Sequence, residues 1–446
     1  ECFEQGLPFF KELENKQDIA KCLNNIGLVH HQKGELDLAL QYYQQTLAVD
    51  QALDNKEGIA TSLNNIGAIY RVKGDLDLAL ECLNQSLILR EKIGNKQDIA
   101  RSLNNIGNIY RQEGNMNLAL EYYQQSLELF KELGNKQEIA GSFNNIGNVY
   151  REKGDINLAL ESHQLSLAER EKIGNEQEIA ESLKNLGNTY WNKGDLNKAT
   201  EYLEQSLAFF ERLGNNFYIA EILFYLISVA LERNVLEETQ SNMEQTDIYL
   251  NQLKAIHHKE SNKIISQQYQ LIKALILNTS DEKSKKLEAQ KCFQQIIQEE
   301  VVSYELTILA RLNLCRLLFE RFVFTGTELY LKDLQTQLTN ILTLARQSHL
   351  QGVILAILLL QGKLDLLQFN LPEAHSLFQQ VKSEAQAKGF EGLEYQCQKE
   401  FTKLQKYKTL EVILEMTEAE KDQFRQQQTE GIVDYLKRVA LQLQAS

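Results

Sequence analysis

The hydrophobic and polar positions of the first half of the chain repeat every 40 residues. Within residues 95–134, apolar or small side chains recur at the spacing of one helix face at Ile99, Ala100, Leu103, Ile106, Gly107 and Tyr110. A second such face follows at Leu118, Ala119, Tyr122, Tyr123, Leu127 and Phe130. Each copy therefore predicts two helices, and the repetition predicts an all-α fold of antiparallel helix hairpins stacked in an array.

Glycine and asparagine mark the predicted turns. Gly114 suits the left-handed position after the first helix of its copy, and Asn115 suits the N-cap of the second helix. Copies end in Gly followed by Asn, and Asn95 with Asp98 has the spacing of a capping box. The pattern predicts helices that alternate with tight turns.

A glycine recurs inside the first helix of the copies, at Gly67, Gly107, Gly147 and Gly187. Because a mid-helix glycine costs about 1 kcal/mol relative to alanine, its recurrence predicts close approach of the paired helix. The facing residues are expected to be small ones of the second helix, namely Ala79, Ala119, Ala159 and Ala199.

The positions of small and large residues resemble the tetratricopeptide repeat, in Leu103, Gly107 and Tyr110 of the first helix and Ala119 and Tyr123 of the second. The 40-residue length and the NIGNxY string resemble the repeats of Pins/LGN-type and kinesin-light-chain-like adaptors. This resemblance implies a right-handed α-α superhelix whose concave side binds a peptide segment or helix of another protein.

Three segments are predicted. Residues 1–254 form the regular array, with a truncated first helix, five good repeats and one degenerate repeat; residues 255–406 form divergent hairpins; and residues 407–446 hold a charged segment and a capping helix. A polar loop is expected at 255–264, and a charged stretch at 417–430 precedes a short helix. Because Glu1 falls in mid-repeat, we expect the natural protein to continue before it, with further repeats or an effector domain.

Helices are also predicted in the divergent segment, where the 40-residue period fails. Amphipathic stretches place them near residues 260–278, 282–299, 303–322, 327–347, 350–368, 372–388 and 390–406.

Composition narrows the functional classes. A net charge of −14 and a pI of about 5.2 argue against nucleic acid as a ligand, because phosphate neutralisation needs a basic face. The apolar stretches are too short for a membrane span, so no membrane partner is expected. Six scattered cysteines without a CxxC pattern favour a reducing, cytoplasmic setting.

Sequence motifs of catalysis are lacking. The chain shows no Walker A loop, GxSxG, HExxH or GxGxxG string, and the adjacent His257 and His258 do not make a metal site alone. We therefore predict a protein that is not an enzyme and that uses no cofactor or metal.

The candidate binding site consists of polar columns on the first helices, and the resemblance directs these columns toward the concave side. Its residues are Asn64, Asn104, Asn144, Lys184, Asn108, Asn148, Asn188, Arg71, Arg111, Arg151 and Trp191. Asparagine is a poor helix former, but its amide offers both a donor and an acceptor and can pair with a peptide backbone. The arginines would add contacts to carboxylates or phosphates, and Trp191 would be an exposed anchor.

Alternatives stay open at this stage. The asparagine columns, including the neighbouring Asn25, Asn65, Asn105, Asn145 and Asn185, could instead join the repeats to one another. The arginines could pair with Glu113 or Glu152, and Trp191 could be buried against the degenerate repeat. The predicted function is a protein-interaction scaffold; the alternatives are a sensing module of a larger signalling protein and a constitutive homo-oligomer.

Overall fold

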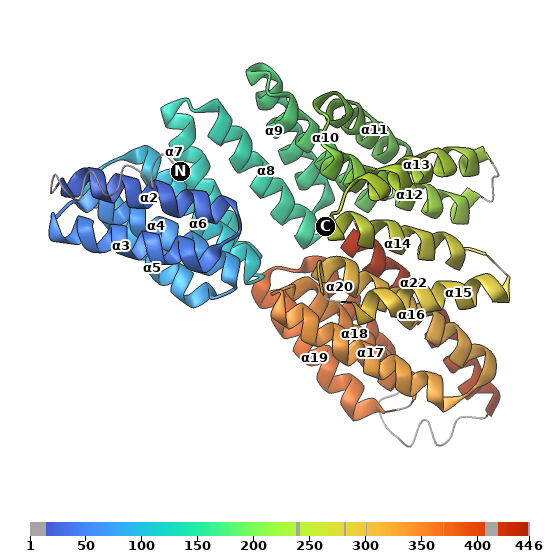
Figure 1. Ribbon diagram of the computed structural model, residues 1–446. Helices are drawn as coiled ribbons and strands as arrows, with labels where there is room; N and C mark the ends of the chain where they lie inside the picture. The colour runs from blue at the N-terminus through green and yellow to red at the C-terminus, as the bar shows by residue number, and fades with distance from the viewer. Residues whose placement is uncertain are drawn as a thin grey trace. The chain divides into compact units, whose positions relative to one another are not determined.

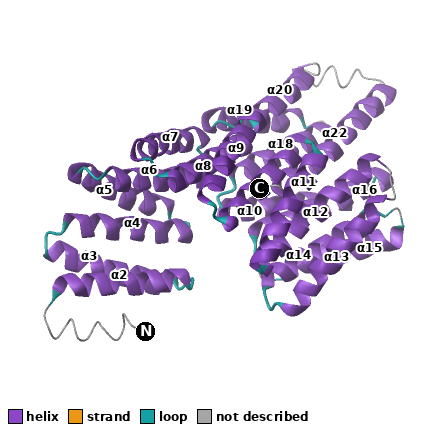
Figure 2. Ribbon diagram, turned by 90° about the horizontal axis from the view of Figure 1, so that it is seen from above, coloured by secondary structure: helices purple, strands orange, loops and turns teal. Residues whose placement is uncertain are grey.

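A computed structural model describes residues 15–237, 241–280, 282–299, 301–368, 370–405 and 418–444. The described residues form helices and no strand, as Figure 2 shows, which confirms the predicted all-α class. They divide into two compact units, named here unit 1 (Glu1–Val149) and unit 2 (Tyr150–Ser446). The truncated helix predicted at residues 1–14 lies outside the described part.

Unit 1 consists of antiparallel helix pairs, in which α2 packs on α3, α4 on α5 and α6 on α7 (Figure 1). Its helices are α2 (Lys16–Gln32), α3 (Leu36–Ala52), α4 (Lys56–Lys73), α5 (Leu76–Ile93), α6 (Lys96–Gln112), α7 (Met116–Leu133) and most of α8 (Lys136–Lys153). The first helix of each pair is called helix A below, and the second helix B.

Unit 2 continues this alternation through the divergent segment. Its helices are α9 (Ile156–Ile173), α10 (Glu176–Lys193), α11 (Leu196–Leu213), α12 (Asn216–Glu237), α13 (Ser241–Lys259), α14 (Lys263–Asn278), α15 (Lys283–Gln298), α16 (Tyr304–Thr325), α17 (Glu328–Gln347), α18 (Gln351–Leu367), α19 (Leu371–Lys388), α20 (Glu391–Gln405) and α22 (Glu418–Gln444). The seven helices predicted between 260 and 406 are confirmed.

Two sequence predictions are wrong in this region. The loop expected at 255–264 is shorter, because α13 continues as a helix through Lys259. The charged stretch expected before a short helix is itself helical, since α22 runs without interruption from Glu418 to Gln444. Charged and glutamine-rich sequence is compatible with a helix when a neighbouring apolar stripe is packed. The domain boundaries at 254 and 406 stay predictions.

The helix ends follow the predicted turn chemistry. Gly114 has a φ of 75°, the left-handed region that favours glycine, and the Asn115 side chain accepts from the Leu118 backbone N–H at 3.3 Å. The Asn95 amide oxygen accepts from the backbone N–H of Asp98 at 3.3 Å, and its Nδ2 donates to the Asp98 carboxylate at 2.7 Å. These contacts satisfy N–H groups that the helix itself cannot pair.

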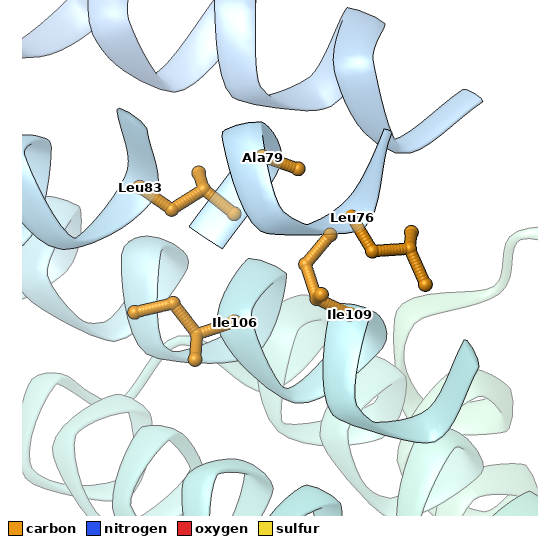
Figure 3. Packing of buried hydrophobic residues seen from close by; sticks show 5 residues of the cluster. All are labelled: Leu76, Ala79, Leu83, Ile106 and Ile109. Carbon is orange, nitrogen blue, oxygen red and sulfur yellow. The ribbon is translucent and has the colours of Figure 1, made fainter. Parts of the chain in front are cut away.

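Within unit 1, the core passes from one repeat to the next. Figure 3 shows Leu76, Ala79 and Leu83 of α5 facing Ile106 and Ile109 of α6, with exposed fractions of 0–7%. Fully burying one such leucine or isoleucine contributes about 1.5–3 kcal/mol. Because helix B of one repeat packs on helix A of the next, no repeat buries its apolar surface alone.

The mid-helix glycines confirm the predicted close approach but meet different residues. A Cβ on Gly107 would lie 2.8 Å from Tyr123 Cδ1, and one on Gly67 would lie 2.9 Å from Leu83 Cγ. The prediction that alanines fill this space is therefore incomplete: Ala79 contributes its carbonyl at 3.2 Å from the Gly67 position, and the large side chain four residues later covers the glycine. Small residues bring the backbones together, and the large residue then lies in the gap.

Candidate functional site

An amide ladder joins the A helices of unit 1. Asn65 Nδ2 donates to Asn24 Oδ1 at 2.9 Å, and Asn105 Nδ2 donates to Asn64 Oδ1 at 3.0 Å. Asn145 Nδ2 donates in the same way to Asn104 Oδ1 at 3.0 Å. The alternative that the asparagine columns join the repeats is therefore confirmed for these pairs.

The direction of these hydrogen bonds decides which amide groups remain available to a ligand. Each bond runs from an amide N–H of one repeat to an amide oxygen of the preceding repeat, so Asn64 and Asn104 use their oxygens. Within the described part of unit 1, no protein acceptor is recorded for the Nδ2 groups of these two residues, and both side chains are partly exposed. Because an asparagine carries two N–H donors, the column presents donors to solvent.

Arg71 and Arg111 add positive charge to the same helices. Arg71 lies on α4 and Arg111 at the equivalent position on α6, and both are partly exposed. Burial lowers the pKa of Arg71, and the positive charge of Arg111 lowers it further, against a raising effect of Tyr123. The guanidinium stays protonated, so the lowered pKa of Arg71 mainly reflects partial desolvation of its charge.

The remaining predicted residues of unit 1 are partly exposed, and two of them have known engagements. Asn108 Oδ1 accepts from the Tyr123 hydroxyl at 2.7 Å, which fixes Asn108 to its own hairpin. Asn144 interacts with neighbouring protein groups, and Asn148 lies one helical turn further along α8. Unit 1 therefore keeps a polar helix A surface made of amides and guanidinium groups.

The structure corrects the site in unit 2. Arg151, Asn188 and Trp191 are only 8%, 4% and 4% exposed, so the prediction that they line an open groove is wrong for these three residues. Trp191 is packed edge-on against Tyr225, and its Nε1 donates to Glu232 at 2.5 Å. The alternative reading of Trp191 as a core residue is the correct one.

Lys184 forms an ion pair with the degenerate repeat. Its ammonium lies 3.0 and 3.1 Å from the two Glu221 carboxylate oxygens, and the side chains are 15% and 19% exposed. Tyr225 donates to the same carboxylate at 3.1 Å; burial, followed by the charge of Glu221, raises the pKa of Tyr225 well above its usual value. The aromatic residues of α12, such as Tyr225 at the position where the preceding repeat has Asn185, thus close the surface that the regular repeats leave open.

Other chemistry is lacking among the described residues. They contain no cluster of three His, Cys, Asp or Glu side chains that could hold a metal ion. Cys315 is fully buried, and this burial raises the pKa of its thiol, which disfavours the nucleophilic thiolate. None of the helices in the described ranges is long and apolar enough to cross a membrane.

The repeated hairpins, the interlocked A helices and the polar helix A surface define a class of protein: a stacked helical-hairpin array. Family models described as tetratricopeptide repeat match residues 58–132 and 138–212, and a further one matches residues 19–49. Residues 19–49, 58–132 and 138–212 are therefore tetratricopeptide repeats. Such repeats are typically modules of protein–protein interaction and are usually not catalytic.

Solved structures with TM-scores above 0.5 share the fold. The apo form of the quorum sensor NprR from B. thuringiensis is 14% identical, with a TM-score of 0.52 over 75% of this chain and 93% of that chain. Aspartyl phosphate phosphatase F from Bacillus subtilis is 12% identical, with the same TM-score over 75% of this chain and 92% of that one. Kinesin-light-chain-like repeats from Podosopora anserina are 18% identical over 44% of this chain and 96% of that chain, at a TM-score of 0.38. A search of curated proteins found no match.

Proposed function

We propose that the chain is a scaffold whose helix A surface in unit 1 binds an extended acidic segment of another protein. The single observation that carries this proposal is the ladder polarity, because it leaves donors along the surface. Asn64 and Asn104 supply amide N–H groups one repeat apart, and Arg71 and Arg111 supply guanidinium groups on the same helices, seven residues further along.

The chemistry of these groups selects an acceptor-rich ligand. Amide N–H groups pair with backbone carbonyls irrespective of the ligand's side chains, and guanidinium groups pair with carboxylates in fork geometry. The whole chain carries a net charge of −14. Two arginines at equivalent positions of successive repeats therefore place positive charge on one surface of an otherwise acidic protein. An acidic peptide is attracted to this surface and repelled elsewhere, which favours one orientation.

The test uses fluorescein-labelled pools of 12-residue peptides that contain four glutamates, with a matched pool in which glutamine replaces glutamate. We expect the wild-type chain to bind the acidic pool and to bind it more weakly as salt rises. The double variant Arg71→Gln with Arg111→Gln should bind about tenfold to a hundredfold more weakly. Arg101→Gln is the matched control, because Arg101 pairs with Glu138 and is 48% exposed. Equal binding of both pools contradicts the proposal.

The amides have their own matched pair of variants. Asn104→Ala and Asn105→Ala each remove one bond of the ladder, but only Asn104→Ala also removes the unused amide donors. We expect Asn104→Ala to weaken binding of the acidic pool about twofold to tenfold more than Asn105→Ala. An equal effect of the two variants would mean that the amides act only between repeats. Asn104→Ala combined with Asn144→Ala extends the test along the column.

A further inference from the structure

Two A helices of unit 2, α16 and α18, lack the polar surface found on the A helices of unit 1. Seven consecutive residues of α18, Ile354–Leu360, have exposed fractions of 0–9%. In α16, most side chains from Leu306 to Phe319 are likewise buried. A helix that is apolar all round must be covered on all sides. α16 packs on α15 and α17, and α18 packs on α17, α19 and α20.

The remaining cover is the C-terminal helix. α22 packs against α16 and α18, although 79 residues separate Tyr435 from its hydrogen-bond partner Ala356 (Figure 1). Its buried side chains fall on one stripe at three- and four-residue spacing, at Gln428, Ile432, Tyr435, Leu436 and Val439. Glu430 and Asp434 of the same helix are exposed. This is the arrangement of an amphipathic helix bound in an apolar groove.

Polar contacts fix the position of α22 in this groove. The Tyr435 hydroxyl donates to the Ala356 carbonyl at 2.9 Å, inside α18. The Tyr435 ring centroid lies 5.2 Å from Lys363 Nζ, a cation–π distance. Lys363 itself forms an ion pair with Glu400 of α20, and the two side chains are 6% exposed each.

The buried ion pair makes this contact reversible in principle. Removing the Lys363 and Glu400 charges from water carries a desolvation penalty, and the Tyr435 ring of α22 lies against the Lys363 ammonium. Release of α22 would let water reach these charges again. The hydration free energy gained would offset part of the cost of exposing apolar surface. A purely apolar groove would hold its occupant more tightly.

We propose that the surface of α16 and α18 is a helix-binding groove, that α22 is its resident occupant, and that an amphipathic helix of a partner protein displaces α22. The partner helix carries aliphatic residues at the spacing of Ile432, Leu436 and Val439 and an aromatic hydroxyl at the place of Tyr435. This groove is separate from the polar surface of unit 1 and takes a different class of ligand.

In this displacement, α22 and the partner helix compete for the same surface of α16 and α18. α22 belongs to the same chain as α16 and α18, so it competes as an intramolecular ligand. A partner helix in trans must therefore bind the groove more tightly than α22 or encounter a chain in which α22 has been weakened. Any change in the apolar stripe of α22 shifts this competition.

The experiment uses the full chain and a fluorescein-labelled peptide of residues 418–444 as the probe. Ile432→Asp with Leu436→Asp should release α22, so the variant should bind the peptide at least about tenfold more tightly than the wild type. Glu430→Gln with Asp434→Asn, on the exposed side of α22, is the matched control and should bind like the wild type. Tyr435→Phe should raise the affinity about twofold to tenfold, because one hydrogen bond is lost.

Three outcomes overturn the proposal. The first is no gain in peptide binding by the Ile432→Asp, Leu436→Asp variant while its far-ultraviolet circular dichroism stays helical. The second is collapse of unit 2 in that variant together with unchanged peptide binding in Tyr435→Phe, because α22 would then be a permanent part of the core. The third is tight binding of the peptide by the wild-type chain without release of α22. Binding of the acidic peptide pool by unit 1 is measured in the same samples and is expected to be unaffected.

Discussion

Gly107 offers a direct test of how the helix pairs are packed. An alanine at this position places a Cβ 2.8 Å from both Tyr123 Cδ1 and Cε1, where ordinary contacts are 3.4–4 Å. Tyr123 is 0% exposed, and its hydroxyl donates to Asn108 at 2.7 Å, so the ring has little room to move. The clash must be relieved by a shift of the ring or of α7 by several tenths of an ångström.

The expected magnitude follows from two opposing effects. Gly→Ala gains about 1 kcal/mol of helix propensity, whereas overpacking a core costs about 1–3 kcal/mol, and the strained Tyr123–Asn108 bond adds about 0.5–1.5 kcal/mol. We therefore expect Gly107→Ala to lower the free energy of unfolding by about 0.5–3.5 kcal/mol. Gly107→Leu adds further volume and should open the hairpin.

Gly141 provides the matched control. It lies in helix A of the next repeat, on α8, and a Cβ there would meet nothing within 4 Å. Gly141→Ala should therefore raise the free energy of unfolding by about 0.5–1 kcal/mol. Urea unfolding followed by circular dichroism at the helical band measures both variants. Opposite signs support the packing; a Gly107→Ala variant as stable as Gly141→Ala would refute it.

The remaining predictions concern buried polar groups. Arg90 is 7% exposed and donates to the Asp98 carbonyl at 2.9 Å and to the Ser102 hydroxyl at 2.8 Å. Arg90→Ala should destabilise the chain by about 2–4 kcal/mol in urea unfolding, whereas Arg90→Phe should stay within about 1 kcal/mol of wild type, because the equivalent position 40 residues later is a buried phenylalanine. In that repeat the Ser142 hydroxyl donates to the Glu138 carbonyl of its own helix, and Ser102 could make the equivalent bond once Arg90 is replaced. Equal losses of stability in Arg90→Ala and Arg90→Phe would contradict this reasoning. Burial and a hydrogen bond to Glu204 raise the pKa of Tyr249 to about 12. An unfolded tyrosine loses its proton near pH 10 while the folded one keeps it, so stability should fall as pH rises from about 10 toward 12. Tyr249→Phe should flatten this dependence in thermal unfolding at alkaline pH, and an unchanged slope would argue against the assignment.

Local pattern was sufficient for much of the fold. Helix caps, turns and helix faces depend on neighbours within a few positions, so they can be read from the sequence directly. Examples are the caps at Asn95 and Asn115, the left-handed Gly114 and the helix faces of residues 95–134. Even the close approach at Gly107 was predictable, because a glycine in a helix interior is unfavourable unless packing compensates. Its partner Tyr123 was harder to identify, since the choice between Ala119 and Tyr123 depends on the rotation of α7.

The candidate site was less predictable, because exposure depends on which helix lies opposite. Asn108 and Asn188 are the same residue type at equivalent positions of two repeats, yet Asn108 is partly exposed and Asn188 is only 4% exposed. The difference comes from the aromatic residues of α12, such as Tyr225, which pack over α10. The sequence did contain a signal for this burial. The degenerate repeat has aromatic residues at positions that are polar in the regular repeats, and large aromatic side chains tend to be buried.

By itself, the sequence determined the helices, their pairing and the period of the array, because these follow from contacts between residues that are close along the chain and repeat with a fixed spacing. Only the tertiary structure decided which polar column stays open and which is covered, since the Asn105–Asn64 and Trp191–Glu232 bonds span 41 residues and the Tyr435–Ala356 bond spans 79. The physical reason is that a helix face carries the same pattern whether it meets water, a ligand or another helix, and long-range packing chooses among them.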